Sequence, residues 1–319
     1  MEGEGAVALH LLSIVGGKGE SILTNKVPGY RRKEMLWAYA FVAIPLLGFV
    51  IFGLAPLIAS AVLSFTKWDM ITPPEFIGWA NYSGMFGDEK VYKAFFNTTF
   101  MLIHVPLGMI VSLLLAVLMN RKMRGISVFR TIYYIPVISP IVAVSILWQW
   151  MLNNDFGVIN QTLWNWFHIT GPNWLGDPNW VKPSLIVMGL WGGVGSNMVL
   201  YLAGLQAISS TYYEAAEVDG ASGWQKFRMI TLPLLSNIHF FVIVMGVIGT
   251  FQAFSQVYVM TPDGGPEYSA GTVVFNVFEH AFSYFDMGYA SAEAWVLGVI
   301  ILLLTLVQFR LSKRWVYND

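Results

Sequence analysis

Of the 319 residues, 56% are hydrophobic and only 12% are charged, whereas a typical soluble domain has roughly 25% charged residues. This number of charged residues is too small to cover the surface of a globule of this length. The composition therefore excludes a soluble enzyme and indicates a surface that faces lipid. The formal net charge of −1 argues against nucleic acid as a partner, which would need a basic footprint. The absence of cysteine excludes disulfides and thiolate metal sites.

The first 34 residues do not have the pattern of a secretory signal peptide. The first charged residues are Glu2 and Glu4, and the apolar run over 6–15 is short and contains His10. A signal peptide needs a basic start and a proper apolar core before its cleavage site. We predict a cytoplasmic extension over residues 1–34 and a transmembrane domain over residues 35–319. An interfacial anchor helix in the extension is the alternative, which the lack of a basic polar face disfavours.

Six segments are long and apolar enough to cross a bilayer as α-helices, which takes about 20 residues each. In chain order they are 36–65, 95–118, 132–151, 185–205, 238–259 and 294–309. The first contains Pro45 and Pro56, so we expect it to be kinked or tilted. The predicted fold class is therefore an all-α integral membrane protein with six transmembrane helices.

The basic residues are distributed unevenly between the connections of these segments. All but four of the 18 Lys and Arg residues precede the first segment, follow the sixth, or lie between the second and third or the fourth and fifth. The four exceptions are Lys67, Lys90, Lys93 and Lys182. The positive-inside rule therefore places both termini in the cytoplasm.

The predicted spans contain no Asp, Glu, Lys or Arg, and His104 is the only histidine well inside one. Ion-coupled carriers keep charged groups within the membrane, so this absence disfavours an ion-driven carrier. His104 is a candidate proton relay, but packing between helices is the favoured interpretation. The adjacent Glu279 and His280 are the closest approach to a catalytic pair, and we expect them to make surface contacts.

No nucleotide-binding or hydrolytic motif is present. Gly16-Gly17-Lys18-Gly19 lacks the spacing of a phosphate-binding loop, and neither H-E-x-x-H nor G-x-S-x-G occurs. We therefore expect no enzyme activity, no metal and no cofactor in this chain. A carrier of this kind needs an external source of energy.

The connection between the fourth and fifth spans reads as two short helices joined by a turn. Thr211 with Glu214, and Ser222 with Gln225, have the spacing of capping boxes. Gly220 is a natural terminator for the first helix. Pro233 is expected to close the second helix and lead into the fifth span.

Two interpretations of this helix pair remain open from the residues alone. Ala215 and Ala216 give the first helix a small face between acidic residues, which would fit a groove on a partner protein. The alternative is an ordinary amphipathic connector on the membrane surface.

The spacing E-A-A-x3-G-x9-I-x-L-P resembles the signature loop of ABC-importer permeases. The matching residues are Glu214, Ala215, Ala216, Gly220, Ile230, Leu232 and Pro233. Four other stretches resemble the sugar-permease branch related to the maltose-type importers, namely 130–136, 173–178, 285–292 and 308–317. The likeness covers residues 36–318. Ser209 stands where the family usually has proline, so a softer start of the first loop helix is expected.

The resemblance implies that the chain is half of a heterodimeric pore in a bacterial or archaeal cell membrane. The implied partners are a second homologous permease, an ATPase dimer that binds ATP and Mg, an extracytoplasmic solute-binding protein, a carbohydrate and membrane lipid. The implied ATPase-coupling residues are Glu214, Ala215, Ala216, Asp219, Gly220, Ile230, Leu232 and Pro233. The loop would act as a lever that couples ATP use to the pore.

By the same resemblance, the fourth and fifth spans would line the substrate pathway. The candidates are Gly189, Gly193, Ser196 and Asn197 on the fourth and Thr250, Phe251, Gln252, Phe254 and Gln256 on the fifth. Gln252 and Gln256 are four residues apart, so we expect them on one helix face. Close helix packing is an equal alternative for the small residues, and a helix–helix amide bond is an alternative for the glutamines.

The function that these features imply is a permease subunit of an ATP-driven importer for carbohydrate, most simply an oligosaccharide. A permease for a sugar-like solute such as glycerol phosphate is one alternative, although the spans lack the basic side chains that this anion favours. A self-contained secondary transporter would need intramembrane charge or an inverted repeat. A membrane-embedded enzyme would need a catalytic cluster.

Overall fold

The computed structural model describes residues 29–121 and 124–316. Most of the predicted N-terminal extension, residues 1–28, lies outside this part of the chain. The chain divides into two units at Ile58 and Ala59, and each is described by itself.

The described part of the first unit, from Gly29 onward, is one continuous apolar helix. It consists of α2 (Gly29–Phe49), the π-helical turn η1 (Val50–Leu54) and the start of α3 (Ala55–Leu63). Within Lys33–Leu63, an 18-residue window has a mean hydropathy of 2.5. The π turn lies directly before Pro56, and the N–H of Ala55 bonds Val50 O across five residues. A proline removes one helical donor, and this wider turn accommodates the loss.

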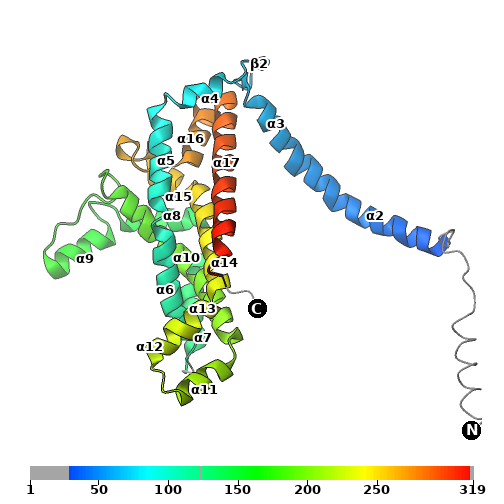
Figure 1. Cartoon of the computed structure of the whole chain (residues 1–319). Helices are drawn as coiled ribbons and strands as arrows, with labels where there is room; N and C mark the ends of the chain where they lie inside the picture. Colours follow the sequence, from blue (N-terminus) through cyan, green and yellow to red (C-terminus); the bar gives the residue numbers. More distant parts are fainter. Residues whose placement is uncertain (1–28, 122–123, 317–319) are drawn as a thin grey trace, which may run out of the picture. The chain divides into compact units, whose positions relative to one another are not determined.

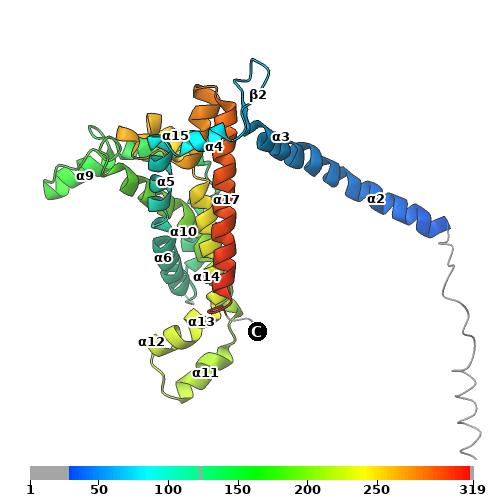
Figure 2. The ribbon, with the colours of Figure 1, turned by 45° about the horizontal axis from the view of Figure 1, so that its top comes forward.

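The second unit begins with short elements that lead into two long helices. A two-residue antiparallel ladder pairs β1 (Thr66–Lys67) with β2 (Glu75–Phe76), with Thr66 opposite Phe76. The following helices are α4 (Ala80–Met85), α5 (Glu89–Met101), α6 (His104–Met119), α7 (Ile126–Ile138), α8 (Ile141–Met151) and α9 (Val158–Phe167). α9 projects from the side of the bundle in both views (Figures 1 and 2).

The rest of the unit alternates long helices with chains of short ones. The elements are α10 (Val181–Ala207), α11 (Ser210–Val218), α12 (Gly223–Lys226), η2 (Phe227–Thr231), α13 (Leu232–Leu234), α14 (Ser236–Phe251), α15 (Ser255–Met260), η3 (Pro262–Gly264), η4 (Pro266–Tyr268), α16 (Val273–Phe278), η5 (Glu279–Ser283) and α17 (Met287–Ser312). Figure 1 shows α11, α12 and α13 at one end of the bundle and α4 at the other.

Four helices in the described part of the chain are long and apolar enough to cross a membrane, and the number reaches six if two bent helix pairs each count as one span. The bent pairs are Ile126–Ile138 with Ile141–Met151, at 100°, and Gly223–Leu234 with Ser236–Phe251, at 62°. The predicted third span over 132–151 is therefore not one uninterrupted helix, but a pair bent near Ser139. Ser139 is extended, with ψ 136°, because it precedes Pro140, a position that disfavours helix.

The predicted fifth span over 238–259 is also interrupted. α14 ends at Phe251 and α15 begins at Ser255, and Phe254 between them has φ −135°. The interruption frees the carbonyl of Ala253, which accepts a hydrogen bond from Thr272 Oγ1 at 2.7 Å. A buried carbonyl needs such a partner, so Thr272 makes the break tolerable.

The core consists of two main apolar clusters along α10. One gathers α5, α15, α16 and the N-terminal half of α10, with Met188, Val257 and Phe275 buried. The other gathers α6, α14 and the C-terminal half of α10, with Met198 and Leu205 buried. α10 therefore forms the axis of the unit, as the side-by-side ribbons of α6 and α10 in Figure 2 illustrate.

The segment 261–286 is anchored by buried polar groups. Asn97 Nδ2 donates to Tyr268 O at 2.8 Å and Gly271 O at 3.0 Å. Lys182 Nζ donates to Ser269 O at 3.1 Å. These bonds satisfy loop carbonyls that are shielded from water, so the segment is part of the core.

A second buried group joins this segment to α17. Tyr268 Oη lies 2.8 Å from Asn276 Oδ1 and 2.8 Å from Glu279 Oε2. Asn276 Nδ2 contacts both carboxylate oxygens of Glu293 at 3.0 Å. Burial, together with the hydrogen bond to Glu279, raises the pKa of Tyr268, so its hydroxyl stays a donor.

Two sequence expectations fail at this cluster. Glu279 is buried instead of making surface contacts, because Tyr268 folds over it. The sixth span, predicted over 294–309 as continuous with Ala290 and Ala292, lies in a helix that starts at Met287. The expectation of spans free of carboxylates therefore fails, because this helix includes Glu293, which is fully buried. An isolated buried charge is costly, and the Asn276 amide reduces that cost by hydrogen bonding.

Candidate transport site

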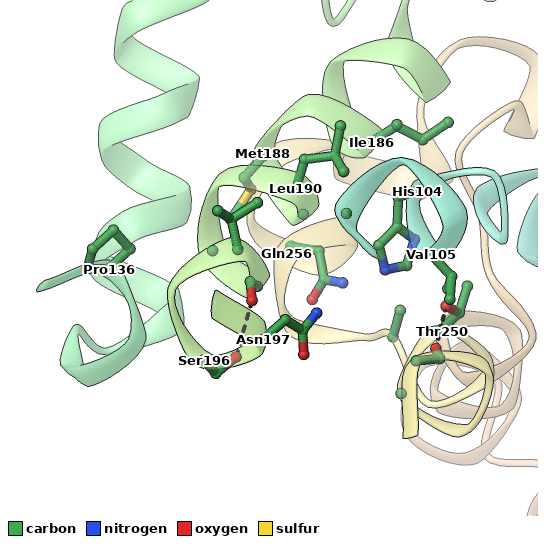
Figure 3. Close-up of a pocket in the computed structure, with 18 of the residues that line it drawn as sticks. His104, Val105, Pro136, Ile186, Met188, Leu190, Ser196, Asn197, Thr250 and Gln256 are labelled. Carbon is green, nitrogen blue, oxygen red and sulfur yellow. Dashed lines mark hydrogen bonds between the residues drawn. The ribbon is translucent and has the colours of Figure 1, made fainter. Parts of the chain in front are cut away.

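A pocket with a cavity volume of about 460 Å³ lies within the second unit. α6, α7, α10, α14 and α15 contribute to its walls (Figure 3). Its size falls in the range of small-molecule sites, roughly 300–1,000 Å³. The lining includes no Asp, Glu, Lys or Arg from the described residues. It is therefore a largely apolar space with a few polar groups.

α10 supplies one wall through small and polar residues, including Gly189, Gly193, Ser196 and Asn197. A Cβ added at Gly193 would meet nothing within 4 Å, so this glycine borders open space. Gly195 behaves differently, because a Cβ there would collide with the carbonyl of Tyr133 on α7. The glycines of α10 thus divide into one set that widens the pocket and one that permits close helix packing.

α14 and α15 supply the opposite wall, which includes Thr250 and Gln256. Phe251, Gln252 and Phe254 are not among the lining residues, although the sequence analysis included them in the pathway. Phe251 is buried in the core, and Phe254 stacks on Tyr258 with ring centroids 5.3 Å apart.

The expectation that Gln252 and Gln256 share one helix face was wrong. Gln252 is the C-cap of α14, and Gln256 follows the break in the next helix, α15. The four-residue spacing gives one face only in an uninterrupted helix. No hydrogen bond is recorded from either glutamine to another helix within the described ranges, so the helix–helix amide bond is not seen.

The sequence analysis missed one wall of the pocket. His104 at the start of α6 and Ser139 at the α7–α8 bend are lining residues. His104 had been interpreted as a packing residue. Its position at the junction of α5 and α6, where Leu102 and Ile103 form a turn, is the signal that could have identified it.

The polar groups of the pocket differ in what they leave free for a ligand. Ser196 Oγ donates to Gly193 O at 2.9 Å, and Thr250 Oγ1 donates to Gly246 O at 2.7 Å. These hydroxyl protons are used within their own helices. Among the described residues, the amides of Asn197 and Gln256 have no recorded protein partner. They are consequently available as both donors and acceptors.

A second feature is the segment 208–235 at one end of the bundle. Ser209 is the N-cap of α11, and its hydroxyl accepts from the N–H of Thr211. The predicted capping box of Thr211 and Glu214 was therefore wrong, because Ser209 takes that role two residues earlier. Gly220 ends the helix with φ +73°, as predicted, a conformation that glycine adopts without steric cost.

The second helix of this segment starts as predicted and ends differently. Ser222 and Gln225 form a reciprocal capping box. Pro233 does not close the helix, because the helical stretch runs to Leu234 and bends at Leu235. The π turn Phe227–Thr231 precedes the proline, and the N–H of Leu232 bonds Phe227 O. As at Pro56, the wider turn accommodates the missing donor.

The two short helix runs of this segment are tied to each other. Tyr213 Oη lies 2.9 Å from Thr231 Oγ1, which is buried. Lys226 Nζ lies 3.5 Å from Glu217 Oε2, an exposed ion pair of small energetic value. α10 leads directly into this segment and α14 leaves it, so its two ends continue into two walls of the pocket.

Of the eight residues that the resemblance implies for ATPase coupling, half are exposed. Glu214, Ala215, Asp219 and Gly220 are exposed, and Ala216 is half-buried. Apolar side chains on the same segment are also exposed, with Val218 at 89%, Met229 at 71% and Trp224 at 67%. Exposed apolar side chains grouped in this way are typical of an interaction surface.

An apolar helical bundle that encloses an uncharged pocket, with an exposed helix pair joined to the pocket helices, is the architecture of a membrane transport component. The chain belongs to a specific family of such proteins, the binding-protein-dependent transport system inner membrane components, which matches residues 105–316. It is an ABC transporter permease, as the resemblance of the loop predicted.

Curated relatives agree with this assignment. The chain is 42% identical over 90% of its length to the probable ABC transporter permease protein YesP of Bacillus subtilis (strain 168), covering 94% of that protein. It is 35% identical over 87% of its length to the lactose transport system permease protein LacF of Rhizobium radiobacter, covering 94% of it.

A solved structure has the same fold. It is described as a bacterial ABC transporter involved in the import of the acidic polysaccharide alginate, and it matches with a TM-score of 0.79 and 24% sequence identity. The match covers 88% of this chain and 96% of that chain. At this identity the similarity concerns the fold alone.

Proposed function

We propose that this chain is one half of the translocation pathway of an ATP-driven carbohydrate importer. The observation that carries the proposal is the continuity between the uncharged pocket and the exposed segment 208–235. α10 and α14 both line the pocket, and in the chain α10 directly precedes segment 208–235 while α14 directly follows it. A displacement of the segment would therefore be transmitted directly to the pocket walls.

In this proposal the bent pair α7 and α8 is one span and α14 is another, which together with the four long apolar helices gives six transmembrane segments with both termini in the cytoplasm. The distribution of Lys and Arg supports this orientation, because the sides that carry most of them face the cytoplasm in membrane proteins. The segment 208–235 then lies on the cytoplasmic side, and the segment 261–286 lies on the outer side. The chain resides in the inner membrane.

The pocket chemistry supports a carbohydrate, with an oligosaccharide as the simplest case. The free amides of Asn197 and Gln256 match hydroxyl groups, which both donate and accept hydrogen bonds. An anion such as glycerol phosphate would favour lysine or arginine side chains, and the described lining offers neither. Relatives named for lactose, multiple sugars and arabino-oligosaccharides support the same class.

The coupling role falls on the first loop helix and its turn. In our proposal Glu214, Ala215, Ala216, Asp219 and Gly220 contact the ATPase, while Ile230, Leu232 and Pro233 transmit the movement to α14. ATP can drive such a switch only by binding one conformation more tightly than the other. The tie between Tyr213 and Thr231 would let the segment move as one body.

The remaining partners complete the importer. A homologous permease forms the second half of the pore, and an ATPase dimer supplies the sites for ATP and Mg. An extracytoplasmic binding protein delivers the carbohydrate. Another solved structure with this fold contains the alginate transporter with a periplasmic protein bound to an alginate pentasaccharide.

The test is uptake and ATP hydrolysis by the full complex in proteoliposomes. The panel of probes is lactose, maltotriose, arabinobiose and a galacturonic acid disaccharide, each supplied with the cognate binding protein. We expect ATP-dependent uptake of at least one saccharide and stimulation of ATP hydrolysis by the loaded binding protein. The control is the same complex with ATP replaced by a non-hydrolysable analogue.

The proposal fails if this chain, purified without partners, concentrates a solute in sealed vesicles. It also fails if no saccharide of the panel is accumulated while a phosphorylated solute is.

A further inference from the structure

We infer that His104 contacts the cargo, as a hydrogen-bond acceptor for a sugar hydroxyl through Nε2. This inference rests on the proposed function, because it concerns the same pocket. It adds a third wall to the predicted pathway, since His104 belongs to α6 and the predicted candidates belong to the fourth and fifth spans.

The first step is the tautomer of the imidazole. His104 Nδ1 lies 2.7 Å from the carbonyl oxygen of Met101. A carbonyl oxygen can only accept a hydrogen bond, so Nδ1 carries the proton. In the neutral ring the other nitrogen then has a free lone pair and acts as an acceptor. The backbone of α5 thus fixes the chemical character of Nε2.

The second step is the direction of the ring. A Cβ added at Gly189 would lie 3.9 Å from His104 Cδ2, an ordinary van der Waals contact, so this ring edge lies beside Gly189, a lining residue of α10. Nε2 is bonded to Cδ2 and therefore lies on the same side. Figure 3 shows the imidazole directed toward the space that Gln256 and Asn197 also face. In the described part of the chain, Nε2 has no recorded protein donor.

The third step concerns the other partners in the pocket. The hydroxyl protons of Ser139, Ser196 and Thr250 are all donated to backbone carbonyls of their own helices. The available acceptors therefore outnumber the available donors, which come from the amides of Asn197 and Gln256. A cargo rich in hydroxyl donors satisfies such a site. A carboxylate, which only accepts, would face the Nε2 lone pair.

His104 has two roles here: an anchor, the hydrogen bond from Nδ1 to Met101 O, and an acceptor, the lone pair of Nε2. A matched pair of variants separates the two roles. In His104→Asn the amide occupies the position of Nδ1 and retains a donor for Met101 O, but nothing replaces Nε2. In His104→Gln the longer amide reaches the position of Nε2 and can present its oxygen to the pocket, but the anchor is lost. His104→Leu removes both groups.

The experiment compares the panel saccharide with the fastest uptake to its monodeoxy analogues, at saturating binding protein and with rates normalised to the amount of incorporated complex. We expect wild type and His104→Gln to transport one deoxy analogue about fivefold more slowly than the parent, the effect of one net hydrogen bond. His104→Asn and His104→Leu should transport both at equal rates, because the acceptor is absent.

The inference is overturned if His104→Asn discriminates like wild type while His104→Gln does not, because the anchor to Met101 would then be the role of the residue. It is also overturned if every variant discriminates like wild type. If the wild-type complex accumulates none of the panel saccharides, that result contradicts the proposed function, and this inference fails with it. Uptake of the parent sugar by wild type distinguishes the two failures.

Discussion

Segment 208–235 connects α10 to α14 and segment 261–286 connects α15 to α17, both through short helical turns, but the two segments are built differently. In 261–286, side chains of Asn97, Thr98 and Glu293 from other helices bond the segment, and Tyr268, Thr272 and Asn276 are buried. In 208–235, the recorded side-chain hydrogen bonds join residues of the segment to each other, as in Ser222 with Gln225 and Tyr213 with Thr231.

The difference indicates two mechanical roles. A connection that is bonded to several spans cannot move without breaking the core, whereas one bonded mainly to itself can move as a unit. Segment 208–235 also exposes the apolar side chains of Val218, Trp224 and Met229, as expected of a surface that a partner covers. Each prediction below tests one side of this comparison.

The largest expected effect is on folding, through the buried cluster of 261–286. Glu293→Ala should destabilise the protein by about 2–3 kcal/mol, because the Asn276 amide would remain buried without its acceptor. The measurement is the thermal unfolding midpoint of the detergent-solubilised protein. Glu293→Gln is the matched control, since its amide oxygen keeps one acceptor, and it should lose less. Equal unfolding of Glu293→Ala and wild type would mean that the cluster contributes nothing.

The next effect is on coupling, with stability unaffected. Glu214→Lys reverses an exposed charge on the proposed ATPase-contacting helix, so sugar-stimulated ATP hydrolysis should fall by roughly tenfold, equivalent to about 1.4 kcal/mol. The unfolding midpoint should stay at the wild-type value, because surface substitutions change stability by only about 0.5 kcal/mol. Glu217→Lys, also exposed on the same helix, is the control for charge alone. Full coupling in Glu214→Lys would remove this helix from the ATPase contact.

A smaller effect is expected from the internal tie of the segment. Tyr213→Phe removes the hydroxyl that lies 2.9 Å from Thr231 Oγ1, a loss of about 1 kcal/mol. Uptake per ATP hydrolysed should fall a few-fold if the segment moves as one body. Thr231→Val should have the same effect, and the double variant should be no worse than either alone. Additive losses would show that the two residues act separately.

The smallest effect is a pH dependence within 261–286. Burial lowers the pKa of His280 below its ordinary value of 6.5, although Asp286 and Asp88 oppose this and Lys90 supports it. As pH falls through 6.5, the unfolded chain binds a proton that the folded protein does not, so stability should decrease until the lowered pKa is reached. The check is the unfolding midpoint between pH 7.5 and 5.5. The slope should be shallower in His280→Gln, and an unchanged slope would exclude this histidine.

Much of the fold could be predicted from local sequence. Four of the predicted apolar segments coincide with long helices, and the other two overlap bent helix pairs. Gly220 and the Ser222–Gln225 box were identified by capping chemistry that involves neighbours within a few residues. The first helix cap was missed because Ser209, Thr211 and Glu214 compete for the same backbone donors. Which of these residues becomes the N-cap of α11 depends on where α10 ends.

The pocket was only partly accessible to the same reasoning. Gly189, Gly193, Ser196, Asn197, Thr250 and Gln256 lie where the resemblance suggested a pathway, but Phe251, Gln252 and Phe254 do not line it. The helix breaks after Phe251, and Thr272, which is distant in sequence, makes the break tolerable by donating a hydrogen bond to the carbonyl of Ala253.

The sequence by itself determined that this chain lies in lipid and which loop has the spacing of an ABC-importer permease, because both depend on composition and on residues close together in the chain. The tertiary structure decided which polar groups are buried and which face the pocket. Glu293 and His104 illustrate this, since their environments are made by residues of other helices, Asn276 and Gly189. Contacts between distant segments fix these environments, and periodicity along one helix cannot specify them.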